Sequence, residues 1–450
     1  MLSAFTNTFK IPELRKRIFF TLSLLVVYRV GCYIPTPGIN SQALSEIFAR
    51  LAQVRGGNIF SMMDIFSGGA ISNATIFALG IMPYISASII MQLLTAVIPH
   101  LEKLSKEGEV GRKKINQYTR YATVGLGLFQ GYMISVGLQN PGSIFGSAAE
   151  NAQIAPPGLA FRLLTMMTLT AGTVFIMWLG EQIDERGIGN GISLVITVSI
   201  ISRAPAAMID AWNVFSPLDP EKQTQPLGLL LVMMVLFVGV VAAVILITQG
   251  QRQIPVQYAK RIVGRKMYGG QRTYIPLRVN QAGVIPIIFA SALLMFPGTL
   301  GGFIPRLQWL ANLLAPGSLL YTLIYVLCIV FFCYFYTAIT FNPVDVADNM
   351  RKYGGFIPGI RPGKNTAEYL DRVMTRITLS GAIFLAAIAI LPTLISGRFQ
   401  LPFNITQFFG GTSLLILVGV MLDTMRQVES HLLMRHYDGF MKKGKLKGRF

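Results

Sequence analysis

The chain has 450 residues, of which 52% are hydrophobic and only 13% are charged, and its formal net charge is +19. Soluble globular proteins carry about 25% charged residues, so this composition excludes a soluble domain and predicts a polytopic membrane protein. The three cysteines lie in apolar segments without metal-ligand spacing, which argues against a disulfide framework and against a metal centre.

Ten apolar segments predict about ten membrane-spanning helices. In chain order they cover residues 18–33, 76–97, 121–138, 159–179, 192–203, 227–248, 284–300, 319–340, 377–395 and 408–423. About 31 of the 39 lysines and arginines lie in the two terminal segments and in alternate loops. The positive-inside rule therefore places both termini in the cytoplasm.

The spans divide into two halves of five, which have inverted topologies. We predict a cytoplasmic amphipathic N-terminus at 1–17, an N-terminal half at 18–205, an external linker at 206–226, a C-terminal half at 227–428 with cytoplasmic loops at 249–280 and 341–376, and a basic cytoplasmic tail at 429–450. Arg29 lies near the far end of the first span, where its side chain is expected to extend to the membrane interface. Pro286 is expected to kink the seventh span.

One apolar stretch, residues 59–94, contains breaks that an ordinary membrane-spanning helix lacks. The interrupting residues are Asp64, Gly68, Gly69, Asn73, Gly80 and Pro83. They predict a half-helix within 59–73, a break, and a full helix from Ile76 to Val97. Irregular backbone at membrane depth is tolerated only where protein buries it or where it lines a wet cavity. The stretch therefore predicts a lumen inside the membrane, partly filled by the half-helix.

An enzymatic function has weak support. Asp345 and Asp348 lie three residues apart beside a membrane span, as in the aspartate-rich motifs that hold magnesium diphosphate in membrane prenyltransferases. Such enzymes use two clusters, and this chain has one. Asp348 pairing with Arg351, or capping of a helix start, is the simpler interpretation. No nucleophile–base arrangement is recognisable, so we expect no catalytic residue.

A secondary transporter of a small solute is the alternative from another functional class. Ion-coupled carriers need ionisable residues at mid-membrane depth. Outside the half-helix, the predicted spans hold almost none, because Glu181 and Asp423 lie at cytoplasmic helix ends. The sequence therefore gives a carrier for a charged substrate little support.

The spans offer isoleucines instead. Ile81 and Ile85 lie four residues apart, and Ile192 and Ile196 repeat that spacing; Ile288 and Ile416 lie within later spans. Isoleucines at helical spacing usually serve ordinary packing. If these faces converge, however, they form a narrow apolar constriction that resists ion flow.

The first long cytoplasmic loop, 249–280, has seven basic residues and no acidic one. Its partly alternating pattern predicts a hairpin that turns at Gly269-Gly270, with Arg265 and Lys266 near the tip and Lys260 and Arg261 close by. Such a tip suits ribosomal RNA phosphates or an acidic protein surface. Positive-inside topology with anionic lipid explains the same charges, and both interpretations stay open. In the second loop, a turn rich in glycine and proline presents Arg361.

Taken together, the chain resembles the SecY family of protein-conducting channels over nearly its whole length. Seven runs carry the resemblance: 65–70 (IFSGGA), 77–88 (FALGIMPYISAS), 178–183 (WLGEQI), 186–193 (RGIGNGIS), 282–286 (AGVIP), 358–363 (PGIRPG) and 409–415 (FGGTSLL). The resemblance implies an all-α membrane protein with two inverted five-helix halves around an hourglass pore. It also implies that the half-helix is a re-entrant plug.

The resemblance further implies roles for individual residues. The plug would include Ile59, Phe60, Met62, Asp64, Phe66, Gly68, Gly69 and Asn73, and the pore ring would be Ile81, Ile85, Ile192, Ile196, Ile288 and Ile416. The second and seventh spans would form a lateral gate toward lipid, with Ser86, Gln92 and Asn280 as polar members. Docking of a motor or ribosome would use Arg252, Lys260, Arg261, Arg265, Lys266 and Arg361. Gln253 stands where the family often has a second arginine, which lowers the charge of that surface.

The implied function is a channel that moves unfolded secretory polypeptides across the membrane and releases membrane segments into lipid. The implied partners are SecE and SecG subunits, the SecA motor ATPase, the ribosome, signal sequences, nascent polypeptides and anionic lipids. The implied location is the inner (plasma) membrane, with multiple spans. No cofactor or metal is expected, because ATP hydrolysis belongs to the motor.

Overall fold

The computed structural model of the chain is mainly helical. It describes residues 11–53, 59–142, 154–215, 226–258, 261–263, 266–268, 272–303, 309, 313–315, 318–399, 405, 408 and 412–443. The N-terminal half contains α2 (Pro12–Gly31), α3 (Ser41–Gln53), α4 (Ile59–Phe66), α5 (Met82–Val97), α6 (Pro99–Lys106), α7 (Glu109–Gln139), α9 (Leu159–Arg186), α10 (Gly191–Ser202) and α11 (Ala204–Phe215).

The C-terminal half adds a small sheet to its helices. Its helices are α12 (Leu227–Gln249), α13 (Ile285–Phe303), α15 (Leu319–Thr340), α16 (Pro343–Lys352), α17 (Lys364–Phe399) and α19 (Thr412–Lys443). Its strands are β1 (Gln251–Tyr258), β2 (Arg261–Val263), β3 (Lys266–Tyr268), β4 (Arg272–Arg278) and β5 (Gly355–Phe356).

The ten segments predicted to span the membrane fall on α2, α5, α7, α9, α10, α12, α13, α15, α17 and α19. Within the described ranges, six helical segments are long and apolar enough to cross a membrane. The number is seven if α5 and α6, which meet at a bend of 99°, count as one span. The chain is therefore a multi-pass membrane protein, and ten spans are consistent with its helices.

Several predicted boundaries differ from the structure. The helix predicted from Ile76 begins only at Met82, because Gly80 has a positive φ of 56° and Pro83 occupies the first turn of α5. Pro286 does not kink the seventh span, since it is the second residue of α13 and has no preceding helical turn to disrupt. The outer loops are not fully irregular either: α3 and α11 lie in segments predicted as loop and linker.

The cytoplasmic loops fold together more than the sequence predicted. Strand β1 pairs antiparallel with β4, and its end pairs with β5 through Gln257 and Phe356, giving the order β4-β1-β5. The hairpin reverses between Val263 and Lys266, which pair in the β2–β3 ladder, and not at Gly269-Gly270. The two loops predicted separately thus share one sheet, which packs on α16 and α17 through an apolar cluster that includes Ile254, Ile357 and Leu370.

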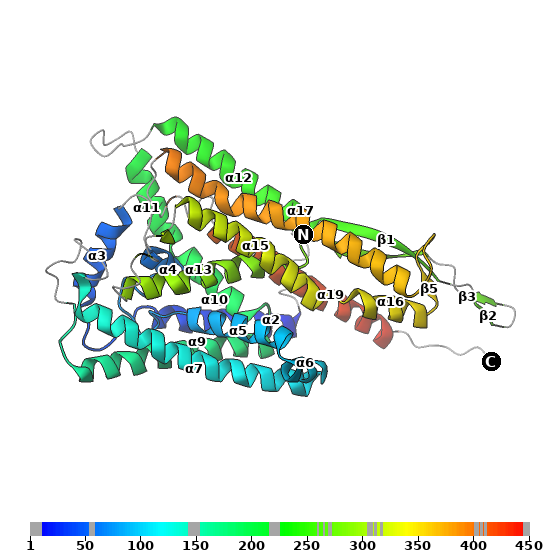
Figure 1. Cartoon of the computed structure of the whole chain (residues 1–450), viewed down its shortest axis with the longest axis horizontal. Coiled ribbons are helices and arrows are strands. Elements are labelled where there is room, and N and C mark those ends of the chain that lie inside the picture. Colours follow the sequence, from blue (N-terminus) through cyan, green and yellow to red (C-terminus); the bar gives the residue numbers. More distant parts are fainter. Residues whose placement is uncertain are drawn as a thin grey trace.

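The helices run roughly parallel in two groups, with the sheet projecting from one end and α3 and α11 at the other (Figure 1). In the N-terminal group α7 packs against α5 and α9; in the C-terminal group α15 packs against α13 and α17. The groups meet where α10 packs against α19 and α5 against α13. The short helix α4 lies inside this junction, in contact with both α10 and α13.

We expect Gly172→Ala to destabilise the N-terminal group. A Cβ atom at Gly172 of α9 would overlap the carbonyl oxygen of Ile76, which belongs to irregular backbone and cannot rotate away as a side chain would. Overpacking of this kind costs about 1–3 kcal/mol, so the thermal unfolding midpoint in detergent should fall.

Gly125→Ala in α7 is the matched control, because a Cβ atom there meets nothing within 4 Å. Alanine also has the higher helix propensity, so this variant should unfold at the same temperature or higher. Equal losses in both variants would contradict the predicted packing of Ile76 against α9.

Candidate functional site

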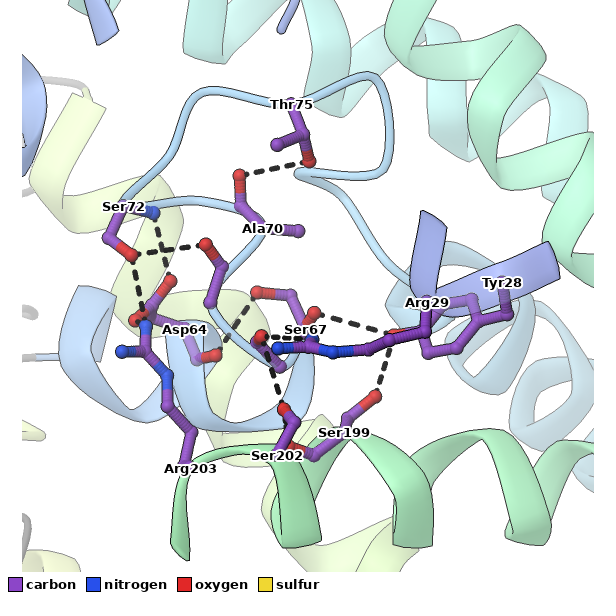
Figure 2. Close-up of polar contacts among 12 residues, drawn as sticks. Tyr28, Arg29, Asp64, Ser67, Ala70, Ser72, Thr75, Ser199, Ser202 and Arg203 are labelled. Atoms are coloured by element: carbon purple, nitrogen blue, oxygen red, sulfur yellow. Dashed lines mark hydrogen bonds and ion pairs between the residues drawn. The ribbon is translucent and has the colours of Figure 1, made fainter. Parts of the chain in front are cut away.

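The predicted half-helix exists as α4, and the chain after it is irregular until Met82. Met62, Met63 and Phe66 of α4 are buried, and Asp64 is only 6% exposed. A buried carboxylate on a short apolar helix needs polar partners, since an unpaired buried charge is costly. The turn that follows α4 and the C-terminal end of α10 supply these partners (Figure 2).

Asp64 is paired on both of its carboxylate oxygens. Oδ1 accepts a hydrogen bond of 2.9 Å from the backbone N–H of Ser72, and Oδ2 forms an ion pair with Nη2 of Arg203, the residue that ends α10. The same Nη2 donates to Ser72 Oγ at 3.0 Å. The three residues form a closed triangle that ties both ends of the turn after α4 to α10.

The C-terminal end of α4 is capped by side chains from other helices. Arg29 Nη1 donates to the Gly68 carbonyl at 2.8 Å, and Ser202 Oγ donates to the same oxygen at 3.3 Å. The Tyr28 hydroxyl donates to the Ser67 carbonyl at 3.3 Å and lies 2.6 Å from Ser199 Oγ. A cation at a helix C-terminus also interacts favourably with the helix dipole. Arg29 therefore contacts the turn after α4 through Nη1, while its Nη2 donates to the exposed Tyr33 hydroxyl at 3.0 Å.

Gly68 and Gly69 allow this close approach. Their φ angles are 68° and 91°, in the left-handed region that favours glycine. A Cβ atom at Gly68 would lie 2.9 Å from the Cα atom of Ser199, and one at Gly69 would lie 3.1 Å from the Arg203 guanidinium. The two glycines thus let the turn lie directly on α10.

The contacts of α4 with the C-terminal half are apolar or weak. It packs against α13, and the Tyr321 hydroxyl of α15 lies 3.9 Å from Met62 Sδ. Sulfur is a weak acceptor, so this contact holds α4 less firmly than the arginines do. Ile59 and Phe60 lie in the first turn of α4, but their side chains are outside the described set. Asn73 lies in the following turn and is exposed.

Five of the six predicted ring isoleucines are buried in the apolar core that also contains Met62, Met63 and Phe66 of α4. They are at most 6% exposed: Ile81, Ile85, Ile196, Ile288 and Ile416. The sixth, Ile192, is partly buried and packs against the same core. The structure thus gathers residues from α5, α10, α13 and α19, together with the N-cap of α5, in one cluster beside the half-helix. Their role as a pore ring stays a prediction.

The predicted gate residues lie in separate places. Ser86 lines a cavity between α5, α7 and α13, together with Met82, Gln130 and Met295. Gln92 donates to Ser88 Oγ at 3.3 Å within α5. Asn280 donates to the Gly283 carbonyl at 2.9 Å and lines a different cavity, with Thr248 and Asp423. The structure does not bring Asn280 to the cavity of Ser86.

The aspartates considered for metal binding have structural surroundings. Asp345 lies in the first turn of α16, and its Oδ2 accepts from Asn342 Nδ2 at 2.8 Å, beside the helix N-cap. Among the described residues, no group of three metal-ligating side chains comes together. The helix-start interpretation given for Asp348 is wrong, because Asn342 caps α16 and Asp348 lies in the middle of that helix.

The structure describes the side chains of two predicted docking residues, and both are exposed. Arg252 is exposed on β1, and Arg361 is exposed in the turn after β5, where its carbonyl accepts from Thr366 Oγ1 at 2.9 Å. Only the backbone of Arg261 and Lys266 is described, in β2 and β3, and Lys260 and Arg265 lie outside the described residues. Pairing of β1 with β5 joins the two loops that carry these residues in one sheet.

Sequence reasoning missed the residues that hold α4 in place: Tyr28, Arg29, Ser199, Ser202 and Arg203. A usable signal was present, because Arg29 and Arg203 lie at the same predicted depth as Asp64, where few other charges occur. Opposite charges at one depth in a membrane protein are expected to pair.

A family model described as SecY matches residues 75–425 of the chain. The protein translocase subunit SecY of Thermotoga maritima is 46% identical over the full length of both chains. The subunit of the same name from Escherichia coli K12 is also 46% identical, covering 97% of this chain and 96% of its own.

Solved channel structures show the same fold at low sequence identity. A protein-conducting channel covers 92% of this chain and 91% of its own, with a TM-score of 0.64 and 18% identity. A SecY structure whose plug domain is described as stabilising the closed channel gives a TM-score of 0.60, with the same coverage and 17% identity. Canine Sec61 in a ribosome–channel complex gives 0.57, with the same coverage and 16% identity.

We expect Tyr28→Phe to loosen the turn after α4. The hydroxyl is buried and bridges Ser67 and Ser199, so its loss leaves the Ser67 carbonyl without that donor. Such a loss costs about 1–3 kcal/mol. The measurement is the thermal unfolding midpoint, together with the rate at which a thiol reagent labels a Ser67→Cys probe.

Tyr132→Phe is the control, because Tyr132 is 43% exposed on α7. It should change neither the unfolding midpoint nor the labelling rate. If Tyr28→Phe also left both unchanged, the hydroxyl would not hold the turn.

Proposed function

This chain belongs to the SecY family of protein-translocating channel subunits, and we propose that α4 and the following turn are its plug, seated beside an isoleucine pore ring in the closed state. The observation that carries the proposal is the position of α4. It is a half-helix inside the junction of two helix groups, in one apolar core with the six isoleucines. A narrow apolar ring resists wetting and ion flow, yet can widen around an extended polypeptide without recognising its sequence.

We also propose that transmembrane segments leave through a lateral gate between α5, α7 and α13. The cavity at this junction is lined mainly by apolar side chains, among them Met63, Met82, Met133 and Met295. Methionine is unbranched and polarisable, so it adapts to apolar side chains of different shape. A hydrophobic segment entering here would touch α4 through Met63 and would therefore compete with the closed plug.

The proposed orientation puts the sheet and both termini in the cytoplasm and the whole chain in the inner (plasma) membrane. Clustering of basic residues at the sheet end supports this orientation. The proposed docking surface, with Arg252 and Arg361, would then face a motor or ribosome. Canine Sec61, which shares the fold, was solved in complex with a ribosome. We propose SecE, SecG, SecA and the ribosome as partners, with ATP hydrolysis confined to the motor.

The direct test is reconstitution of the chain with its small partner subunits into vesicles. A secretory polypeptide added with the motor and ATP should become protected from external protease. Uptake of a small solute down an ion gradient, without protein translocation, would overturn the proposal.

We expect Ile81→Ser and Ile416→Ser to raise the ion leak of the resting channel. Both side chains are at most 2% exposed in the shared core, and a hydroxyl there lets water enter the constriction. Planar-bilayer conductance measures the leak, with Ile81→Val and Ile416→Val as controls that keep the site apolar. Unchanged conductance in both serine variants would exclude these residues from the ring.

We expect Arg361→Glu to slow motor-driven translocation at least about tenfold without changing the resting leak. The exposed arginine lies on a turn fixed by Gly359 and Gly363, whose φ angles are 84° and 105°, so reversal of its charge acts on the docking partner and not on the pore. Arg372→Glu on α17, also exposed, is the control. Equal translocation rates for Arg361→Glu and the parent protein would remove Arg361 from the docking surface.

A further inference from the structure

Among the described residues, the ion pair of the plug and its hydrogen bonds between oxygen or nitrogen atoms and other helices all involve the N-terminal half. Tyr28 and Arg29 belong to α2, and Ser199, Ser202 and Arg203 belong to α10 or end it (Figure 2). Both helices are in the N-terminal half. The contacts with the C-terminal half, through α13 and Tyr321, are apolar or weak. The N-terminal half therefore holds α4 through polar contacts, whereas the C-terminal half holds it through apolar or weak contacts.

We propose that Asp64, Ser72 and Arg203 form a latch, a set of polar contacts that fixes the plug to the N-terminal half. Separation of the two halves then breaks only the apolar contacts of the plug. The plug leaves the pore in a second step, when the ion pair breaks. This inference rests on the proposed channel function and concerns the regulation of that site. The Arg29 and Tyr28 bonds to the carbonyls after α4 support the latch from α2.

Because the ion pair is largely buried, it can hold the plug against the N-terminal half. The side chain of Asp64 is 9% exposed and that of Arg203 is 31% exposed, so water screens the pair only in part. Removing one partner leaves the other charge buried, which costs far more than removing both. Arg203 Nε is buried without a hydrogen-bond partner among the described residues, and Nη2 contacts both Asp64 and Ser72.

The geometry also makes the latch releasable. Asp64 contacts Ser72 within the plug, so this bond can travel with the plug when it moves. The bonds that must break are those of Arg203 to Asp64 and Ser72, together with the bonds of Arg29, Tyr28 and Ser202 to two backbone carbonyls. Each of these groups can then bond water instead. Release therefore becomes easier once water reaches the site.

The test begins with the resting conductance of Asp64→Asn and Arg203→Gln channels in planar bilayers. Each should raise the probability of the conducting state about tenfold, which corresponds to about 1.4 kcal/mol. The double variant should leak no more than the leakier single variant, because the two residues act through one interaction. Additive leaks would mean that they act separately and would overturn the latch.

Arg162→Gln is the matched control, since Arg162 pairs with Gln139 between α7 and α9 and does not contact the plug. It should leave the conductance unchanged. Arg203→Lys guards against a loss of folding: it keeps the positive charge beside Asp64 and should leak less than Arg203→Gln. Leak equal to the parent in all Asp64 and Arg203 variants would also overturn the latch.

A reversible cross-link tests the second step. In an Asp64→Cys, Arg203→Cys variant, a reducible bis-maleimide should join the plug to α10 and block translocation, and reduction should restore it. The native cysteines Cys32, Cys328 and Cys333 are buried, so the parent protein serves as the reagent control. Translocation at the unlinked rate would show that the plug need not leave α10.

The outcomes separate this inference from the proposed function. Suppose that Ile416→Ser raises the conductance and the parent protein translocates polypeptide, but the Asp64 and Arg203 variants conduct no more than the parent. Then only the proposed latch is wrong. If neither kind of variant conducts and the parent translocates nothing, the channel function itself is wrong.

Discussion

The structure depends on satisfying irregular backbone that lies inside a membrane protein. Between α4 and α5 the chain cannot use helical hydrogen bonds, yet Ser67, Ala70 and Thr75 are buried. Unpaired peptide groups at this depth cost several kcal/mol each. The chain pairs these groups locally, as where the Ala70 carbonyl accepts from Thr75 twice, and through the segment after α2, where the Ile34 carbonyl accepts from the Ile76 N–H. The positions of α2 and α10 follow from this requirement as much as from apolar packing.

The same requirement explains two arginines beside an apolar core. Arg29 and Arg203 supply donors to a turn that lacks enough of its own, and Arg203 also neutralises Asp64. A buried ion pair adds little net stability over an apolar pair of the same size, but it penalises every arrangement in which one partner is left alone. Asp64 and Arg203 therefore specify where α4 and its turn rest more than they stabilise the fold.

Local patterns predicted much of this arrangement, and contacts distant in sequence account for the rest. The half-helix, the break at Gly68-Gly69 and the following span were readable from composition. The start of α5 at Met82 was missed because residues 76–81 are mostly apolar, although Pro83 is a usual first-turn signal. The joining of two cytoplasmic loops by β1 and β5 leaves no local trace, since β5 has only two residues. The partners of Asp64 were missed for the same reason, because Arg203 lies in another span.

Water weakens both the isoleucine core and the Asp64–Arg203 ion pair, and this shared response couples them. Exclusion of water keeps the isoleucines in contact and keeps the Asp64–Arg203 attraction strong. Two unit charges 4 Å apart attract by about 4 kcal/mol at an effective dielectric constant of 20, but by about 1 kcal/mol in water. Shifting a two-state equilibrium from 1:99 to 99:1 takes about 5.5 kcal/mol. Wetting of the ion pair therefore supplies part of such a shift, and loss of the apolar contacts of Met62, Met63 and Phe66 must supply the remainder. Because each change admits the water that drives the other, opening is expected to be cooperative.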